Sequence, residues 1–196
     1  MRSKLFIIAI AAVLLTGCTT KSKFYQLHPK ASAHADHKKI KHNTVIGVGE
    51  VETSEYLRKP EVVTRLSAGR IDIRDADRWA GSLPKNIQSV LRYNLSAYLP
   101  KYTLLAYPWE EPINDDYRLY VTIDRFDGST TGLVTLEGRW SIVAQQDDKV
   151  LFGESIHYKE QGGTTLDETI DTQSRMLDKL SRHIARKIGA RISRGH

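Results

Sequence analysis

Two stretches of the chain repeat apolar residues with the 3.6-residue period of an amphipathic helix. The first lies between Ser82, which can cap a helix, and Pro100, which stops one. Its apolar stripe consists of Leu83, Ile87, Val90, Leu91 and Tyr98. The second begins at about Leu166, and its stripe consists of Leu177, Leu180, Ile184, Ile188 and Ile192. We therefore expect two helices, each of which buries one face.

Three consecutive segments alternate apolar and polar residues, which indicates half-buried strands. They cover residues 117–123, 134–144 and 150–158. The dipeptide Asp127-Gly128 is expected to begin the turn after the first segment, and Asp147-Asp148 to make a tight turn before the third. We expect the three strands to pair antiparallel.

Further extended segments complete the expected sheet. Short apolar runs at residues 44–51, 62–66, 70–73 and 102–106 are typical of extended chain. Together with the two helices, these segments predict a single mixed α/β domain at residues 44–196. Its sheet is expected to be mixed and mostly antiparallel, with about five to six strands.

The first eighteen residues have the pattern of a lipoprotein signal. A short positive stretch precedes eleven apolar residues, 5–15, and the lipobox Leu-Thr-Gly-Cys ends at Cys18. Eleven residues are too few to cross a hydrocarbon core, which takes about 20 helical residues, so we expect residues 1–17 to be cleaved off. Cys18 then carries a diacylglyceryl thioether and an acyl chain such as palmitate on its new amine, and this attachment is effectively permanent. The alternative is an ordinary signal peptide that leaves Cys18 as a free thiol.

The residues after Cys18 predict where the anchored protein lies. Asp at the positions of Thr19 and Thr20 would retain a lipoprotein at the inner membrane, so its absence favours the periplasmic face of the outer membrane. Residues 18–43 are expected to form the lipid anchor and a flexible linker, because residues 28–43 are polar and lack an apolar period. The linker contains His28, His34, His37 and His42. We interpret them as part of a solvated tether; a metal site is the alternative, but their spacing fits no helix face.

Composition narrows the class of protein. Removing 17 residues leaves 196 − 17 = 179, enough for one domain with its own core. A hydrophobic content of 40% and a charged content of 27% are close to globular averages and argue against a disordered, collagen-like or multi-span membrane chain. The net charge of +6 falls to +4 without Arg2 and Lys4, which is too mild to indicate a nucleic-acid partner. Cys18 is the only cysteine, so packing must hold the domain without a disulfide.

The motifs of common enzymes are missing from the sequence. Gly47-Val48-Gly49 lies in an expected strand and is followed by no third glycine, which argues against a dinucleotide-binding loop. His157 and His183 are the remaining candidate bases, and neither has an identifiable nucleophile as partner. We expect no enzymatic activity, no metal and no cofactor, apart from the covalent lipid on Cys18.

Two sets of residues are candidates for partner binding. Aromatic and apolar residues outside the clear stripes are typical interface anchors, and here they are Phe24, Tyr25, Tyr56, Leu57 and Trp79. For each of them, packing in the core is the alternative. The second set is a basic face opposite the apolar stripe of the last helix, formed by Arg175, Lys179, Arg182 and Arg186. This face could contact anionic lipid or an acidic partner, and a solvated helix surface is the alternative.

An ordered set of short motifs resembles the ABC-type transport auxiliary lipoproteins. After the lipobox these motifs are Phe24-Tyr25-Gln26-Leu27, Tyr56-Leu57-Arg58-Lys59-Pro60-Glu61-Val62-Val63, Arg78-Trp79-Ala80-Gly81-Ser82-Leu83, residues 121–128 and Leu136-Glu137-Gly138-Arg139-Trp140. The resemblance spans nearly the whole mature chain. It implies a mixed sheet with two helices and a non-enzymatic outer-membrane lipoprotein that works beside a tunnel-forming protein of the mammalian-cell-entry (MCE) type in intermembrane lipid transport. Arg58-Lys59 departs from the family pattern, which often has an acidic residue there, so details of the partner contact are expected to differ.

Two other functions fit the same sequence. A lipid carrier would enclose an apolar pocket of about 300 to 1,000 Å³ and would copurify with lipid. A general envelope scaffold would bind peptidoglycan or another lipoprotein through the basic face, and salt would release it. The sequence is also compatible with a homo-oligomer.

Overall fold

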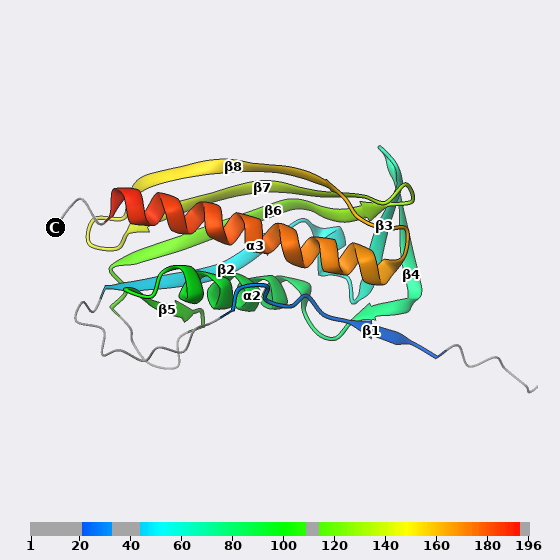
Figure 1. Ribbon diagram of the computed structural model, residues 1–196, viewed down its shortest axis with the longest axis horizontal. Coiled ribbons are helices and arrows are strands. Elements are labelled where there is room, and N and C mark those ends of the chain that lie inside the picture. Colours follow the sequence, from blue (N-terminus) through cyan, green and yellow to red (C-terminus); the bar gives the residue numbers. More distant parts are fainter. Residues whose placement is uncertain (1–20, 33–43, 109–113, 193–196) are drawn as a thin grey trace, which may run out of the picture.

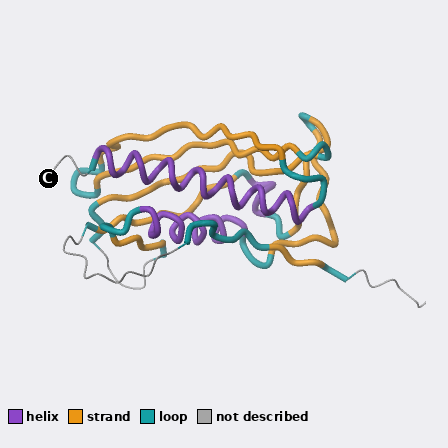
Figure 2. Tube along the Cα trace, viewed as in Figure 1, coloured by secondary structure: helices purple, strands orange, loops and turns teal. Residues whose placement is uncertain are grey.

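Strands and helices follow one another in the order that the sequence patterns predict. The computed structural model describes residues 21–32, 44–108 and 114–192. Its elements are β1 (Lys23–Tyr25), β2 (Val45–Thr53), the 3₁₀ helix η1 (Glu55–Arg58), β3 (Glu61–Ser67), β4 (Arg70–Trp79), α2 (Leu83–Tyr98), β5 (Thr103–Ala106), β6 (Tyr117–Ser129), β7 (Leu133–Ala144), β8 (Lys149–Gln161) and α3 (Leu166–Arg191). The helices α2 and α3 contact each other and lie together over the sheet (Figures 1 and 2).

The long strand β6 is the centre of an eight-stranded mixed sheet. One edge of β6 pairs antiparallel with β7, which pairs antiparallel with β8. The other edge pairs in parallel with β2 over its first half and with β3 at its end, so two branches leave it, β2-β5 and β3-β4-β1. The mixed α/β class is confirmed, but the sheet has eight strands instead of five to six. One of the strands that the sequence pattern did not predict is β1, because its three residues are too few to show a period of apolar positions.

The turn expected at Asp127-Gly128 is a wrong prediction, because β6 continues through both residues to Ser129. Glycine is needed at position 128 for close packing: a Cβ there would lie 2.6 Å from the Thr169 side chain of α3. The chain reverses later, near Gly132, whose φ of +80° favours glycine. The turn at Asp147-Asp148 is confirmed.

The strand expected at residues 70–73 is longer than its sequence pattern indicated. β4 extends to Trp79, three residues before the N-cap of the first helix. Its last three residues pair with β1 in parallel, and β1 in turn occupies an edge of the sheet. The pairing therefore joins the N-terminal segment to the branch formed by β3 and β4.

Both expected helices are confirmed, with the predicted stripes facing the core. Ser82 occupies the N-cap of α2 without a side-chain hydrogen bond, and Pro84 lies in the first turn. α3 begins with a capping box, in which Thr165 Oγ1 accepts the Glu168 N–H at 3.3 Å and Glu168 Oε2 accepts the Thr165 N–H at 3.0 Å. The Thr165 hydroxyl, which donates to Glu168 Oε2 at 2.7 Å, and then the Thr165 N–H lower the pKa of the Glu168 carboxyl. Within the described ranges, no helix is both long enough and apolar enough to span a membrane.

Candidate interaction surfaces

The N-terminal strap, residues 26–31, lies across both helices and joins β1 to the body. On α2, Asn86 forms two hydrogen bonds with Leu27: its Oδ1 accepts the Leu27 N–H at 2.7 Å and its Nδ2 donates to the Leu27 carbonyl at 3.1 Å. Farther along α2, Asn94 Oδ1 accepts the Ala31 N–H at 3.2 Å. Leu27 and Ala31 are buried, so the strap adds apolar surface to the core as well as hydrogen bonds.

The strap also contacts α3, through residues 28 and 30. The backbone N–H of His28 donates to Ser174 Oγ at 3.3 Å, and Lys30 Nζ lies 2.5 Å from Asp171 Oδ1. The hydrogen bond from Lys30 lowers the pKa of the Asp171 carboxyl. The expected linker at residues 28–43 is therefore corrected at its start, because residues 28–31 pack on the helices. The rest of it, from residue 33, lies outside the described residues, as do His34, His37 and His42.

Cys18, the expected lipidation site, also lies outside the described residues. The described chain begins at Lys21, and β1 begins two residues later. Any lipid carried by Cys18 would thus be joined to a segment that is paired with β4 and then fastened to α2 and α3.

Phe24 is the most exposed of the five predicted contact residues. Its exposed fraction is 66%, and it lies on the edge strand β1. The neighbouring Tyr25 is half-buried and donates its hydroxyl to Asp77 Oδ1 at 3.2 Å. Burial, followed by the effect of Asp77, raises the pKa of the Tyr25 phenol. Of this pair, only Phe24 presents a largely free apolar surface.

Tyr56 belongs to a buried polar network around Asp127. The Asp127 side chain is completely buried and accepts hydrogen bonds from Tyr56 Oη at 2.9 Å, Arg65 Nη2 at 2.9 Å and Arg125 Nε at 3.0 Å. Burial and the adjacent carboxylate raise the pKa of Tyr56 to about 12. The sequence pattern missed this network, because its members come from η1, β3 and β6 and only the β3–β6 pairing brings them together.

Leu57 and Trp79, two of the predicted contact residues, are corrected to core residues. Their exposed fractions are 3% and 7%, and both belong to the main apolar cluster. The reason is their position: Leu57 points inward from the 3₁₀ turn η1, and Trp79 ends β4 beside β1. Neither offers a surface to a partner in this structure.

All four residues of the predicted basic face are exposed on α3, but two of them are paired with carboxylates. Arg175 Nε lies 3.2 Å from Glu160 Oε1 and also pairs with Asp171, while Arg182 pairs with Asp178. Among the described residues, no carboxylate partner is found for Lys179 or Arg186. The excess positive charge of this face therefore comes from Lys179 and Arg186.

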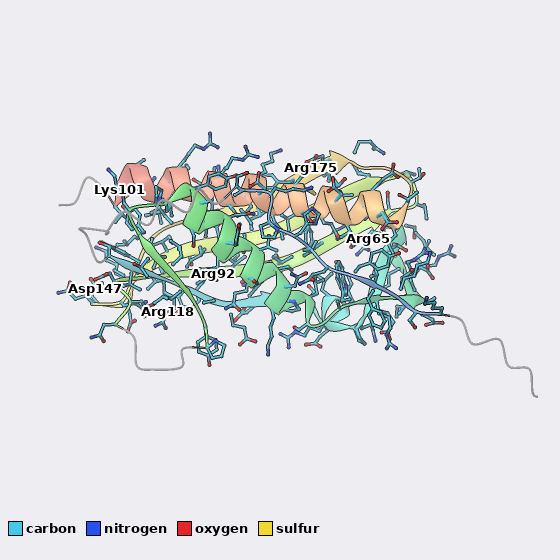
Figure 3. The ribbon with its side chains drawn as sticks, turned by 60° about the horizontal axis from the view of Figure 1, so that its bottom comes forward. Arg65, Arg92, Lys101, Arg118, Asp147 and Arg175 are labelled. Carbon is cyan, nitrogen blue, oxygen red and sulfur yellow. The ribbon has the colours of Figure 1, made fainter. Side chains whose placement is uncertain are left out.

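A hollow of about 620 Å³ lies along this basic face. It is lined by Tyr98, Glu160, Arg175, Lys179, Arg182, Ala185 and Arg186. Tyr98 donates its hydroxyl to Asp178 at 2.5 Å, and burial raises the pKa of Tyr98 to about 12. Lys179 Nζ lies 4.9 Å from the centre of the Tyr158 ring, a cation–π contact. Five of the seven lining residues carry a charge, and four of these charges are positive; Figure 3 labels Arg175 on α3.

Each of the two candidate bases lies beside a carboxylate of the sheet. His183 Nε2 lies 2.6 Å from Glu154 Oε2, and His157 Nδ1 lies 3.3 Å from Glu137 Oε1. Hydrogen bonds from Lys187 and His183 lower the pKa of the Glu154 carboxyl. Across the described part of the chain, neither histidine is hydrogen-bonded to a hydroxyl, and no group of three metal-ligating side chains is found.

Comparison with known proteins supports the same architecture. The family model of the ABC-type transport auxiliary lipoprotein component matches residues 25–185. A crystal structure of an uncharacterized protein is 24% identical, with a TM-score of 0.71, over 86% of this chain and 99% of that one. A Xanthomonas campestris protein is 12% identical, with a TM-score of 0.66, over 84% of this chain and 93% of its own. At these identities the two structures establish similarity of fold alone. No curated protein sequence matches the chain.

Proposed function

Because the chain belongs to the family of ABC-type transport auxiliary lipoprotein components, we propose that it is a docking component of an MCE-type intermembrane lipid transport system. In this role it has no enzymatic activity. Lipid on Cys18 holds it at the periplasmic face of the outer membrane, and its folded body binds the tunnel-forming partner.

The family match over residues 25–185 is the observation that carries this proposal. It includes the strap, strands β2 to β8, α2 and most of α3, which form most of the described body. The lipobox that ends at Cys18 supplies the anchor, and Thr19 and Thr20 agree with sorting to the outer membrane. A docking component needs a membrane anchor and a surface that binds its partner. It does not need to catalyse a reaction.

The surface chemistry of the body supports docking more than lipid carriage. The hollow along α3 is open to solvent, whereas a lipid carrier needs an enclosed apolar cavity. Lys179 and Arg186 lie exposed on α3 without a carboxylate partner among the described residues, which suits contact with an acidic surface. We assign the partner contact to this face.

Crosslinking in the native envelope tests the proposal. The lipidated protein would be captured after crosslinking, and mass spectrometry would identify the proteins bound to it, with Cys18→Ser as the matched control. We expect an MCE-type tunnel protein to be recovered with the lipidated chain and to be lost or reduced with Cys18→Ser, because the anchor raises the local concentration of the docking body. Recovery of stoichiometric lipid without such a protein would support the carrier instead.

A further inference from the structure

We propose that the protein stands end-on at its membrane, with the end formed by β1 and the β3–β4 hairpin against the lipid headgroups. The inference rests on the lipidation of Cys18 in the proposed function. Beyond the proposed function, it specifies which end of the fold contacts the membrane and which end points away from it.

The chain between the lipid and the body is too short to act as a long tether. Lys21 is three residues after Cys18, and an extended chain spans at most about 3.6 Å per residue, so the two Cα atoms lie within about 11 Å. The next residues cannot extend this reach without breaking structure, because residues 23–25 pair with β4. The strap that follows is hydrogen-bonded to Asn86 and Asn94 of α2.

The start of β1 lies at one end of the long axis of the molecule. Figure 1 shows β1, β3 and β4 together at this end, while the β7–β8 turn and the end of α3 lie at the other. In Figure 3, Arg65 of β3 is labelled toward the first end and Asp147 at the second. The 26 residues of α3 run between the ends, which separates them by about 39 Å at 1.5 Å per residue. A tether of about 11 Å is short compared with this length.

The side chains at the β1 end suit an anionic lipid surface. Phe24 is 66% exposed and follows Lys21 and Lys23 in a short basic and aromatic segment. Within the described ranges these two lysines, together with Lys59 just before β3 and Arg70 of β4, form no ion pairs. Asp72 and Asp75 of β4 form none either, so four free cations stand against two free carboxylates of β4. Cations near a bilayer are attracted to anionic headgroups, and an aromatic side chain is stable at the interface. At the opposite end, the turn carries Asp147 and Asp148, which Lys149 follows, and Figure 3 labels Lys101 at this end as well.

A second orientation would lay the basic face of α3 flat on the membrane. It is less favourable, because Arg175 and Arg182 already have carboxylate partners and only Lys179 and Arg186 remain to attract lipid. The two orientations place different residues near the headgroups. They can therefore be separated by measurement.

The experiment places one fluorophore on the full-length lipidated protein in vesicles of phosphatidylethanolamine and phosphatidylglycerol. Because the Cys18 thiol is consumed by the lipid, Gly69→Cys, Gln146→Cys and Arg186→Cys each introduce a unique thiol. Gly69 lies in the β3–β4 turn, where a Cβ meets nothing within 4 Å, and Gln146 lies exposed in the β7–β8 turn. Quenching by an acceptor attached to the lipid headgroups reports the proximity of each position.

We expect quenching to be several-fold stronger at position 69 than at position 146, with position 186 between them. Inserting about ten Gly and Ser residues between Thr20 and Lys21 lengthens the tether, and should bring the ratio of positions 69 and 146 toward one. Equal quenching at all positions without the insertion, or the strongest quenching at position 186, would overturn the inference. Acyl labelling and flotation of each variant separate the two proposals. A chain that is not acylated would contradict both the proposed function and the end-on orientation. An acylated chain that shows no difference in quenching between positions 69 and 146 would contradict the end-on orientation alone.

Discussion

Asp127 is the residue on which the junction between β3 and β6 depends. Its side chain is fully buried, and its charge is balanced by Arg65 and Arg125. The Arg65 guanidinium also lies over the Tyr56 ring, 5.8 Å from its centre. A buried carboxylate with several donors is stable only while all of them stay in place.

Replacing Asp127 with Asn should therefore lower the free energy of unfolding by about 3 to 5 kcal/mol, because two arginines lose their buried counter-charge. Tyr56→Phe is the matched control: it removes one hydrogen bond and keeps both ion pairs, and should cost about 1 kcal/mol. Urea unfolding of the anchor-free protein measures both values. Equal losses in the two variants would contradict a role for the charge.

The raised pKa of Tyr56 predicts a loss of stability in alkali. A tyrosine whose pKa rises from 10.0 to about 12 on folding stabilises the folded state fully below pH 10, and this contribution is lost as the pH rises from 10 to about 12. The free energy of unfolding should fall more steeply over this range in the natural chain than in Tyr56→Phe. Identical slopes would show that Tyr98, whose pKa is raised similarly, dominates the effect.

At the scale of elements, the strap connects the N-terminal segment to two helices that are far from it in the sequence. Asn86 reproduces with its side chain the two hydrogen bonds that a neighbouring strand would offer to Leu27. Because backbone groups in a buried segment need partners, the strap depends on this residue.

Asn86→Ala should release the strap while leaving the sheet folded. We expect a loss of about 1 to 2 kcal/mol in the free energy of unfolding and a much faster hydrogen exchange of the Leu27 amide. Lys85→Ala, at the exposed neighbouring position, is the control and should change neither. Unchanged exchange at Leu27 in Asn86→Ala would mean that apolar packing alone holds the strap.

At the scale of the whole molecule, charge is distributed so that one exposed face of α3 remains positive. Lys179 and Arg186 are the residues on this face without carboxylate partners among the described residues. A partner with an acidic surface would gain both affinity and rate of association from them.

Reversing both charges, in Lys179→Glu with Arg186→Glu, should reduce capture of the tunnel protein by about tenfold without unfolding the domain. The matched control reverses Arg139 and Lys159, which are exposed on β7 and β8 and change the net charge equally. Quantitative crosslinking in the envelope measures the difference. Equal capture by the two double variants would exclude α3 as the contact surface.

The sequence determined the local features of this protein. Periodic apolar residues identified both helices and most strands, because each period reports a face that must be buried. The lipobox predicted the anchor at Cys18, and the ordered motifs indicated the family that the match over residues 25–185 establishes.

Tertiary structure decided the features that join distant segments. Leu57 and Trp79 lie in the core. Asp127 is the centre of a buried hydrogen-bond network and does not begin a turn. The first residues of the expected linker form a strap on α2 and α3. None of these follows from a local period, since each depends on which strands pair and which side chains then meet across them. The same pairing places β1 at one end of the molecule, so the orientation at the membrane could be inferred only from the assembled fold.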